Sequence, residues 1–319
     1  MRIAVLIALV LPLTLSALAS AQPATPAARP AARPAQQPAA RPGSPKPPTS
    51  AAEALTVDVR SRAVRPGEVL DIRVQTAERL TSVAVTLGDR PLHAWKLPSG
   101  GWRVLAGLDA EQVPGPLVLT VLGARASGAP IAKVLNLTVA AANFADRRLT
   151  VPPKFVDPPE SERPRIERER QRLQAIYDGH SDLAPGVFVA PVPHRRSSPF
   201  GSRSIFNGVP RERHGGMDFA SPAGAIIRAP AAGRVVVVGP LYWTGNTVVI
   251  DHGQGLYSIL AHMTRTLVRE GDTVASGARL GTVGATGRVT GPHLHWSVRL
   301  GGTRVDPAAV LAVLGPRRP

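Results

Sequence analysis

The 319-residue chain contains no cysteine, and aromatic side chains make up only 4% of it. The absence of cysteine excludes disulfide bonds, thiolate metal sites, cysteine nucleophiles and a lipidated N-terminal cysteine. Few aromatics, dispersed arginines and no helix-turn-helix pattern argue against a nucleic-acid-binding protein. Acidic residues are also scarce, at 22 against 38 Lys and Arg, which gives a formal net charge of +16. Such a charge favours anionic partners.

Residues 1–21 have the pattern of a secretory signal peptide. Arg2 precedes an apolar run over residues 3–15, and the small triplet Ala19-Ser20-Ala21 provides a cleavage site. The apolar run is short for a durable membrane helix, and no second apolar stretch is long enough to span a bilayer. We therefore expect export to the periplasm, the cell envelope or the exterior. A retained N-terminal anchor is the alternative.

Two further segments precede the region that carries the chemistry. Residues 22–54 are dominated by Pro and Ala, a composition that predicts a disordered, semi-rigid tether. Residues 55–140 contain short alternating runs separated by Gly, Pro, Asp and Ser. This pattern predicts a β-sandwich accessory domain of immunoglobulin-like type.

Residues 141–185 are predicted to form a connector that contains one helix. Ser161 is the expected N-cap, and the helix should run to Tyr177, with Gly179 just beyond its end. Its Glu and Arg residues alternate in sign, a pattern typical of a solvated surface.

Residues 186–319 are again β-rich, and they are predicted to form an antiparallel β-sheet domain. Seven of the eight histidines of the chain lie at or after His180. The expected fold class is therefore mainly β, with the reactive groups concentrated in the C-terminal domain.

Two histidines, His293 and His295, stand two positions apart at the head of an apolar, strand-like run. On a strand, alternate side chains point to the same face, so both imidazoles should face one side. The pair fits a metal ligand beside a proton-transfer group. Two exposed strand histidines are the alternative, because such a motif needs its context.

The segment from His214 to Asp218 could supply two more ligands. On a regular strand these residues would be about 13 Å apart, whereas ligand atoms lie about 2 Å from a zinc ion. Gly215 and Gly216 between them allow a bulge or bend that would bring them together.

A fifth candidate, His262, ends the apolar run that begins at Tyr257. His252 lies in a predicted hairpin turn, and we expect it to be structural or exposed. The five remaining residues suffice for three metal ligands and two groups that handle protons. Spacing alone does not assign a role to each histidine. The five are His214, Asp218, His262, His293 and His295.

The region 198–310 resembles the lysostaphin/LytM-type zinc metallopeptidases of family M23. The motifs that carry the resemblance occur in order and with the family's spacing. They are His214-x-x-x-Asp218-Phe219-Ala220, Pro222-x-Gly224, Ala229-x-x-x-Gly233-x-Val235, Val249-Ile250-Asp251-His252-Gly253, Tyr257-x-x-x-x-His262-Met263, and Gly287 followed by Thr290-Gly291-Pro292-His293-Leu294-His295-Trp296.

The resemblance implies one zinc ion per chain, held by His214, Asp218 and His295, with His262 and His293 serving catalysis. It also implies hydrolysis of peptide bonds in the stem peptides or cross-bridges of peptidoglycan. Tyr257 and Met263 depart slightly from the family pattern, at positions expected to bear on substrate positioning and not on the reacting groups. A non-catalytic factor that binds peptidoglycan or activates another hydrolase is the alternative function. Anionic envelope polymers are further expected partners.

Overall fold

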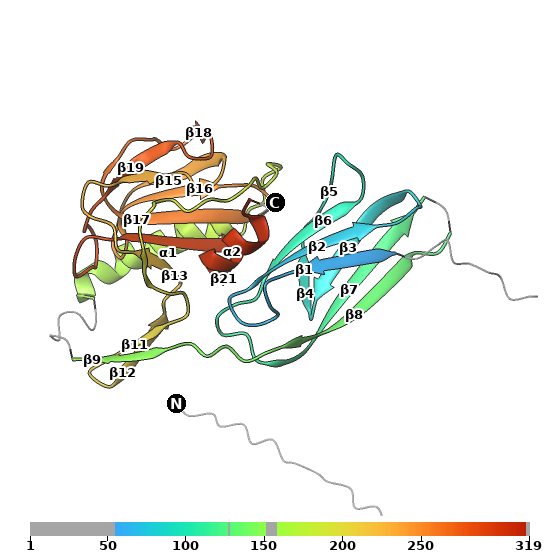
Figure 1. The fold of residues 1–319 in the computed structure, drawn as a ribbon, viewed down its shortest axis with the longest axis horizontal. Helices are drawn as coiled ribbons and strands as arrows, with labels where there is room; N and C mark the ends of the chain where they lie inside the picture. Colours follow the sequence, from blue (N-terminus) through green and yellow to red (C-terminus); the bar gives the residue numbers. More distant parts are fainter. Residues whose placement is uncertain (1–54, 127, 151–157, 317–319) are drawn as a thin grey trace, which may run out of the picture. The chain divides into compact units, whose positions relative to one another are not determined.

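The computed structural model of the chain describes residues 55–126, 128–150 and 158–316. The predicted signal peptide (1–21) and the predicted tether (22–54) precede these ranges, so both predictions lie outside the described residues. Strands dominate the described chain, and almost all of them pair antiparallel, which confirms the mainly β fold (Figure 1). No helix within these ranges is long and apolar enough to cross a bilayer.

The first part of the described chain contains two four-stranded sheets with a shared apolar core. Alternating apolar residues on the strands fill this core, among them Ile72, Val85, Val104 and Val121. This arrangement matches the expected sandwich, and its immunoglobulin-like type stays a prediction. One sheet has the order β1 (Thr56–Arg60), β2 (Val69–Gln75), β6 (Trp102–Gly107), β5 (Ala94–Lys96), and the other has β4 (Arg90–Leu92), β3 (Leu80–Leu87), β7 (Gly115–Arg125), β8 (Ile131–Val139).

The connector contains one strand that the sequence did not indicate. Strand β9 (Asp146–Leu149) pairs in parallel with β11 (Arg203–Phe206), which also pairs with β12 (Val209–Arg213). The connector helix α1 spans Arg163–Tyr177, close to the expected range. The expected N-cap was wrong: Ser161 lies inside a short 3-10 helix, Glu160–Glu162, and Glu162 is the N-cap residue of α1.

The C-terminal part is a ten-stranded sheet. Its main path runs β10-β13-β20-β17-β16-β15-β18, so β13, β20 and β17 are neighbours although they are far apart in sequence. The strands are β10 (Arg196–Ser198), β13 (Gly216–Phe219), β14 (Ile226–Arg228), β15 (Gly233–Leu241), β16 (Gly245–Asp251), β17 (Leu256–Thr266), β18 (Thr273–Val274), β19 (Arg279–Val283), β20 (Leu294–Leu300) and β21 (Thr303–Val305), followed by helix α2 (Pro307–Leu314).

The two faces of this sheet are covered by different groups. A large core cluster includes the fully buried Trp296 of β20 and Leu260 of β17. A second cluster joins Tyr177 of α1 to Val237 of β15 and Val249 of β16. Helix α1 is therefore fixed to the sheet by apolar burial, although most of its residues are charged or polar (Figure 1).

Candidate metal centre

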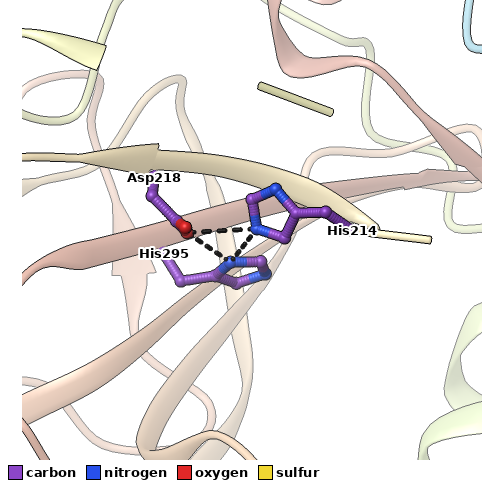
Figure 2. A group of neighbouring side chains, drawn as sticks. All are labelled: His214, Asp218 and His295. Atoms are coloured by element: carbon purple, nitrogen blue, oxygen red, sulfur yellow. Dashed lines mark hydrogen bonds and ion pairs between the residues drawn. The ribbon is translucent and has the colours of Figure 1, made fainter. Parts of the chain in front are cut away.

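Three side chains meet at the junction of β13 and β20 (Figure 2). The Nε2 atom of His214 lies 3.1 Å from Oδ1 of Asp218 and 3.1 Å from Nδ1 of His295. The distance from His295 Nδ1 to Asp218 Oδ1 is 2.9 Å. One atom of each residue thus points to a common centre.

Strand pairing accounts for two of these positions. Asp218 of β13 and His295 of β20 are directly opposed in the antiparallel register. Opposed residues of such a pair have Cβ atoms only about 5 Å apart, so short side chains on the same face can meet. His214 lies between the end of β12 and the start of β13, and its backbone N–H donates to the carbonyl of Ser202 at 2.7 Å. The chain therefore bends before β13, as the glycine pair suggested.

The physical role of Gly216 differs from the one expected. Neither Gly215 nor Gly216 has a positive φ, so left-handed backbone freedom is not what the site needs. A Cβ atom at Gly216 would lie 2.7 Å from Cε1 of His295 and 2.6 Å from the carbonyl oxygen of Trp296. Glycine is thus required here because the imidazole of His295 occupies the space.

A second contact orients the His214 ring. Its Nδ1 lies 3.0 Å from the carbonyl oxygen of Pro199, which can only accept a hydrogen bond. The Nδ1 proton is therefore committed to that carbonyl, and in the neutral ring Nε2 offers a lone pair to the centre. Such a bond to the remote nitrogen is the usual way in which a metal-binding histidine is held in one tautomer.

The electrostatics of the three groups are strongly coupled. Burial opposes the charge of Asp218, but the close contacts with the rings of His214 and His295 outweigh burial and lower the pKa of this carboxyl below its usual range. Burial also lowers the pKa of His295, whereas the carboxylate of Asp218 outweighs burial at His214 and raises the pKa of that ring. Two ring nitrogens and one carboxylate oxygen, all of them half-buried, converge on one point and form a centre suited to a cation.

The separations fit a tetrahedral metal site. Ligand bonds of about 2.0–2.1 Å at tetrahedral angles place ligand atoms about 3.3 Å apart. The observed separations of 2.9–3.1 Å are close to that value. Two imidazoles and one carboxylate form a donor set suited to zinc, and three protein ligands leave a fourth position for water or substrate.

The other two predicted histidines stand beside this centre. The ring centroid of His262 lies 4.9 Å from that of His293 and 5.9 Å from that of His295. The Nδ1 atom of His262 donates to the carbonyl of Thr286 at 2.9 Å, and that of His293 donates to the carbonyl of Gly291 at 2.9 Å. The Nε2 atom of His293 is 3.8 Å from Oδ1 of Asp218. All five candidate residues are thus brought together.

His262 has an unusual backbone and a perturbed side chain. Its φ of 64° is in the left-handed region, which is uncommon for a residue with a Cβ. Burial, with the nearby His295 as a further cause, lowers the pKa of the His262 imidazole to about 4. The ring is therefore neutral near pH 7, with its Nδ1 proton held by Thr286 and its Nε2 able to accept a proton.

Two other residues of the motifs lie outside the centre. His252 is buried, where its ring contacts the carbonyl of Ala232 and the hydroxyl of Ser258, each at 2.8 Å, so its role is structural. The hydroxyl of Tyr257 donates to the carbonyl of Gly179 at 2.9 Å, beyond the C-terminal end of α1. Tyr257 therefore anchors the connector to the sheet.

Several groups that complete the site were not found by sequence reasoning. They are the backbone carbonyls of Pro199, Thr244, Thr286 and Gly291. A carbonyl is present at every residue, so no residue type marks it. Only the folded backbone shows which carbonyls accept a hydrogen bond from an imidazole or, in the case of Thr244, from the backbone N–H of His262.

Comparison with known proteins agrees with this geometry. Residues 212–307 match the model of Peptidase family M23. The DD-carboxypeptidase/endopeptidase Mpg of Neisseria meningitidis serogroup B is 39% identical over 126 residues, which cover 39% of this chain and 29% of Mpg. The peptidoglycan DD-endopeptidase ShyA of Vibrio cholerae is 41% identical over 93 residues, covering 29% of this chain and 22% of ShyA. The matched region thus spans under a third of these relatives.

A solved structure extends the likeness beyond the metal centre. A crystal structure described as a peptidase M23 from Pseudomonas aeruginosa superposes with a TM-score of 0.59 at 31% identity. The match covers 79% of this chain and 96% of the Pseudomonas chain, so it includes more than the ten-stranded sheet. On these grounds, and with the centre of two histidines and an aspartate, the chain belongs to peptidase family M23.

Proposed function

We propose that this protein is an exported zinc metalloendopeptidase that hydrolyses peptide bonds of peptidoglycan stem peptides or cross-bridges. The observation that carries the proposal is the convergence of five residues in one cluster. His214, Asp218 and His295 would hold the metal, and His262 and His293 would act on the substrate. One zinc ion per chain follows from the single centre of this kind in the described part of the chain.

The metal and the two further histidines would divide the work of hydrolysis. A zinc ion held by the three ligands acts as a Lewis acid toward a scissile carbonyl and toward water. His262, kept neutral by burial, is suited to take the proton of the attacking water at Nε2. His293 stands across from it, and we assign it to orient the water and stabilise the tetrahedral intermediate by hydrogen bonding.

The substrate class is proposed from the relatives. Mpg and ShyA are named as a DD-carboxypeptidase/endopeptidase and a peptidoglycan DD-endopeptidase. We therefore favour a D,D cross-link between stem peptides over a glycine-containing bridge. The signal-like residues 1–21 and the net charge of +16 support action in an envelope of anionic polymers.

The test is digestion of purified, cross-linked peptidoglycan by the full chain, with mass analysis of the soluble products. We expect peptide fragments with new amino termini, and His262→Ala should abolish them while it retains zinc. If glycan ends appear instead, or if the zinc-loaded protein cuts nothing but still sediments with peptidoglycan, the non-catalytic binding function becomes the better description. Comparing substrates with D,D cross-links and with glycine bridges would identify the bond.

A further inference from the structure

The charged face of helix α1 does more than contact solvent. Glu169 uses one carboxylate oxygen to accept the backbone N–H of Tyr242 at 2.8 Å and the other to accept from Arg165, also at 2.8 Å. Its side chain is only 19% exposed, whereas Glu167 on the same helix is 49% exposed and bonds Arg170 of that helix. Glu169 therefore ties the helix to the turn that follows β15.

That turn, residues 242–244, leads directly to the site. The carbonyl of Thr244 accepts the backbone N–H of His262 at 2.8 Å. The carbonyl of Trp243 accepts the N–H of Arg288 at 3.0 Å, and Arg288 belongs to the loop whose Thr286 carbonyl holds the His262 ring. The turn thus supports His262 from its backbone side and, through the second loop, from its ring side.

His262 needs such support because of its backbone conformation. A non-glycine residue in a sparsely populated region costs about 1–3 kcal/mol and persists only where its surroundings fix it. His262, with φ of 64°, is in this category. The bond to Thr244 is one of the contacts that fix it, so the position of the 242–244 turn sets where the imidazole stands.

We propose that Glu169 of the connector helix is a positioning residue for His262, acting through the 242–244 turn. The helix can serve this purpose because apolar burial of Tyr177, with Leu173 packed beside it, fixes it to the sheet. The inference rests on the proposed function in that His262 is taken as the proton acceptor. It makes the connector part of the catalytic unit, although the connector lies outside the 212–307 region that matches the family model.

The experiment compares three variants of the full, zinc-loaded chain. Glu169→Ala removes the acceptor, Glu169→Gln retains a neutral one, and Glu167→Ala is the matched control on the exposed side of the same helix. We expect Glu169→Ala to lower kcat on cross-linked muropeptides about tenfold, with KM and zinc content near the parent values. A neutral acceptor gives a bond roughly half as strong, so Glu169→Gln should restore about half of the lost free energy and leave kcat about threefold below the parent value.

A structural measurement separates this inference from the proposed function. The backbone amide of His262, observed by NMR, should lose its hydrogen-bonded signature in Glu169→Ala and keep it in Glu167→Ala, whatever the activity. Equal kcat and equal amide behaviour in these two variants would overturn the inference. A Glu169→Ala protein that loses zinc, or that Glu169→Gln does not restore, would show a merely structural residue and would also overturn it. An inactive parent whose amide responds as expected would refute the proposed function alone.

Discussion

Gly216 offers a direct test of how the metal centre is built. In Gly216→Ala the new Cβ would lie 2.6 Å from the Trp296 carbonyl oxygen, 2.7 Å from Cε1 of His295 and 2.8 Å from Nε2 of His295. Two of these three contacts are with the imidazole that faces the metal. Relief of the overlap must therefore move either this ring or the pairing of β13 with β20.

The size of the effect follows from the cost of overpacking. Extra methyl groups in a well-packed site cost about 1–3 kcal/mol. If the His295 ring takes up the strain, the zinc dissociation constant should rise about five- to 150-fold, since each 1.4 kcal/mol is about a factor of ten. If the strand pairing takes it up, the metal-free protein should instead unfold at a lower temperature.

Gly215→Ala is the matched control, because its Cβ would come to 3.0 Å from Cδ of Arg304. That neighbour is a flexible, partly exposed side chain that can move aside. The assay is chelator competition for zinc on the full chain, together with thermal unfolding of the metal-free form. A Gly216→Ala protein with parental zinc affinity and parental stability, or one indistinguishable from Gly215→Ala, would refute the steric reasoning.

Two further predictions concern stability and the metal. Burial lowers the pKa of His252 from 6.5 to about 4, so the unfolded chain takes up a proton in this window before the folded chain does. The contribution of His252 to the free energy of unfolding is therefore complete above pH 6.5 and is lost as the pH falls toward 4, by up to about 3 kcal/mol. Denaturant unfolding at several pH values should show this decrease, and His252→Asn should make the free energy of unfolding less dependent on pH in this window. Removal of zinc by a chelator should abolish hydrolysis and leave the circular dichroism of the sheets unchanged, because the core is apolar and separate from the ligands. Added zinc should restore activity. Loss of the β-sheet signal on chelation would contradict the view that the fold does not depend on the metal.

Much of the fold was accessible from the sequence because the core obeys simple periodicity. Alternating runs predicted the sandwich strands, and apolar runs with glycine turns predicted strands such as β16 and β17. Strand β9 was missed because the segment Asp146–Leu149 is largely charged and short, and it forms only by pairing with β11, which is more than 50 residues away. The start of α1 was misplaced because residues 160–162 form a 3-10 helix that includes Ser161, so Ser161 cannot act as the N-cap residue of α1.

The candidate site was predictable in composition but not in detail. Five titratable residues stood out because histidine is rare and clustered in this chain. The expected bend before β13 is present, but the need for glycine at position 216 comes from the space that the His295 imidazole occupies, which the sequence does not reveal. Glu169 was missed because an alternating charge pattern indicates only that a helix is exposed on average. It does not show that one half-buried carboxylate accepts a hydrogen bond from the backbone N–H of Tyr242, which is distant in the sequence.

The two histidines of the His293-x-His295 motif turn different ring nitrogens toward the centre. Their spacing in the sequence does not show this difference, so it could not assign a role to each of them. His214, His262 and His293 each commit Nδ1 to a backbone carbonyl, so each turns Nε2 inward. His295 instead presents Nδ1, the nitrogen nearer its backbone, because β20 pairs directly with β13 and places His295 opposite Asp218.

A last prediction follows from this difference in reach. The Nδ1 of a histidine and the Oδ1 of an aspartate are both three bonds from Cα, whereas Nε2 is four bonds away. His295→Asp should therefore place an oxygen near the lost ligand atom and keep measurable zinc binding, while His214→Asp should fall short and lose it. Zinc affinity of the two variants, measured side by side on the full chain, checks the assignment. Stronger binding by His214→Asp than by His295→Asp would mean that the ligand atoms have been assigned the wrong way round.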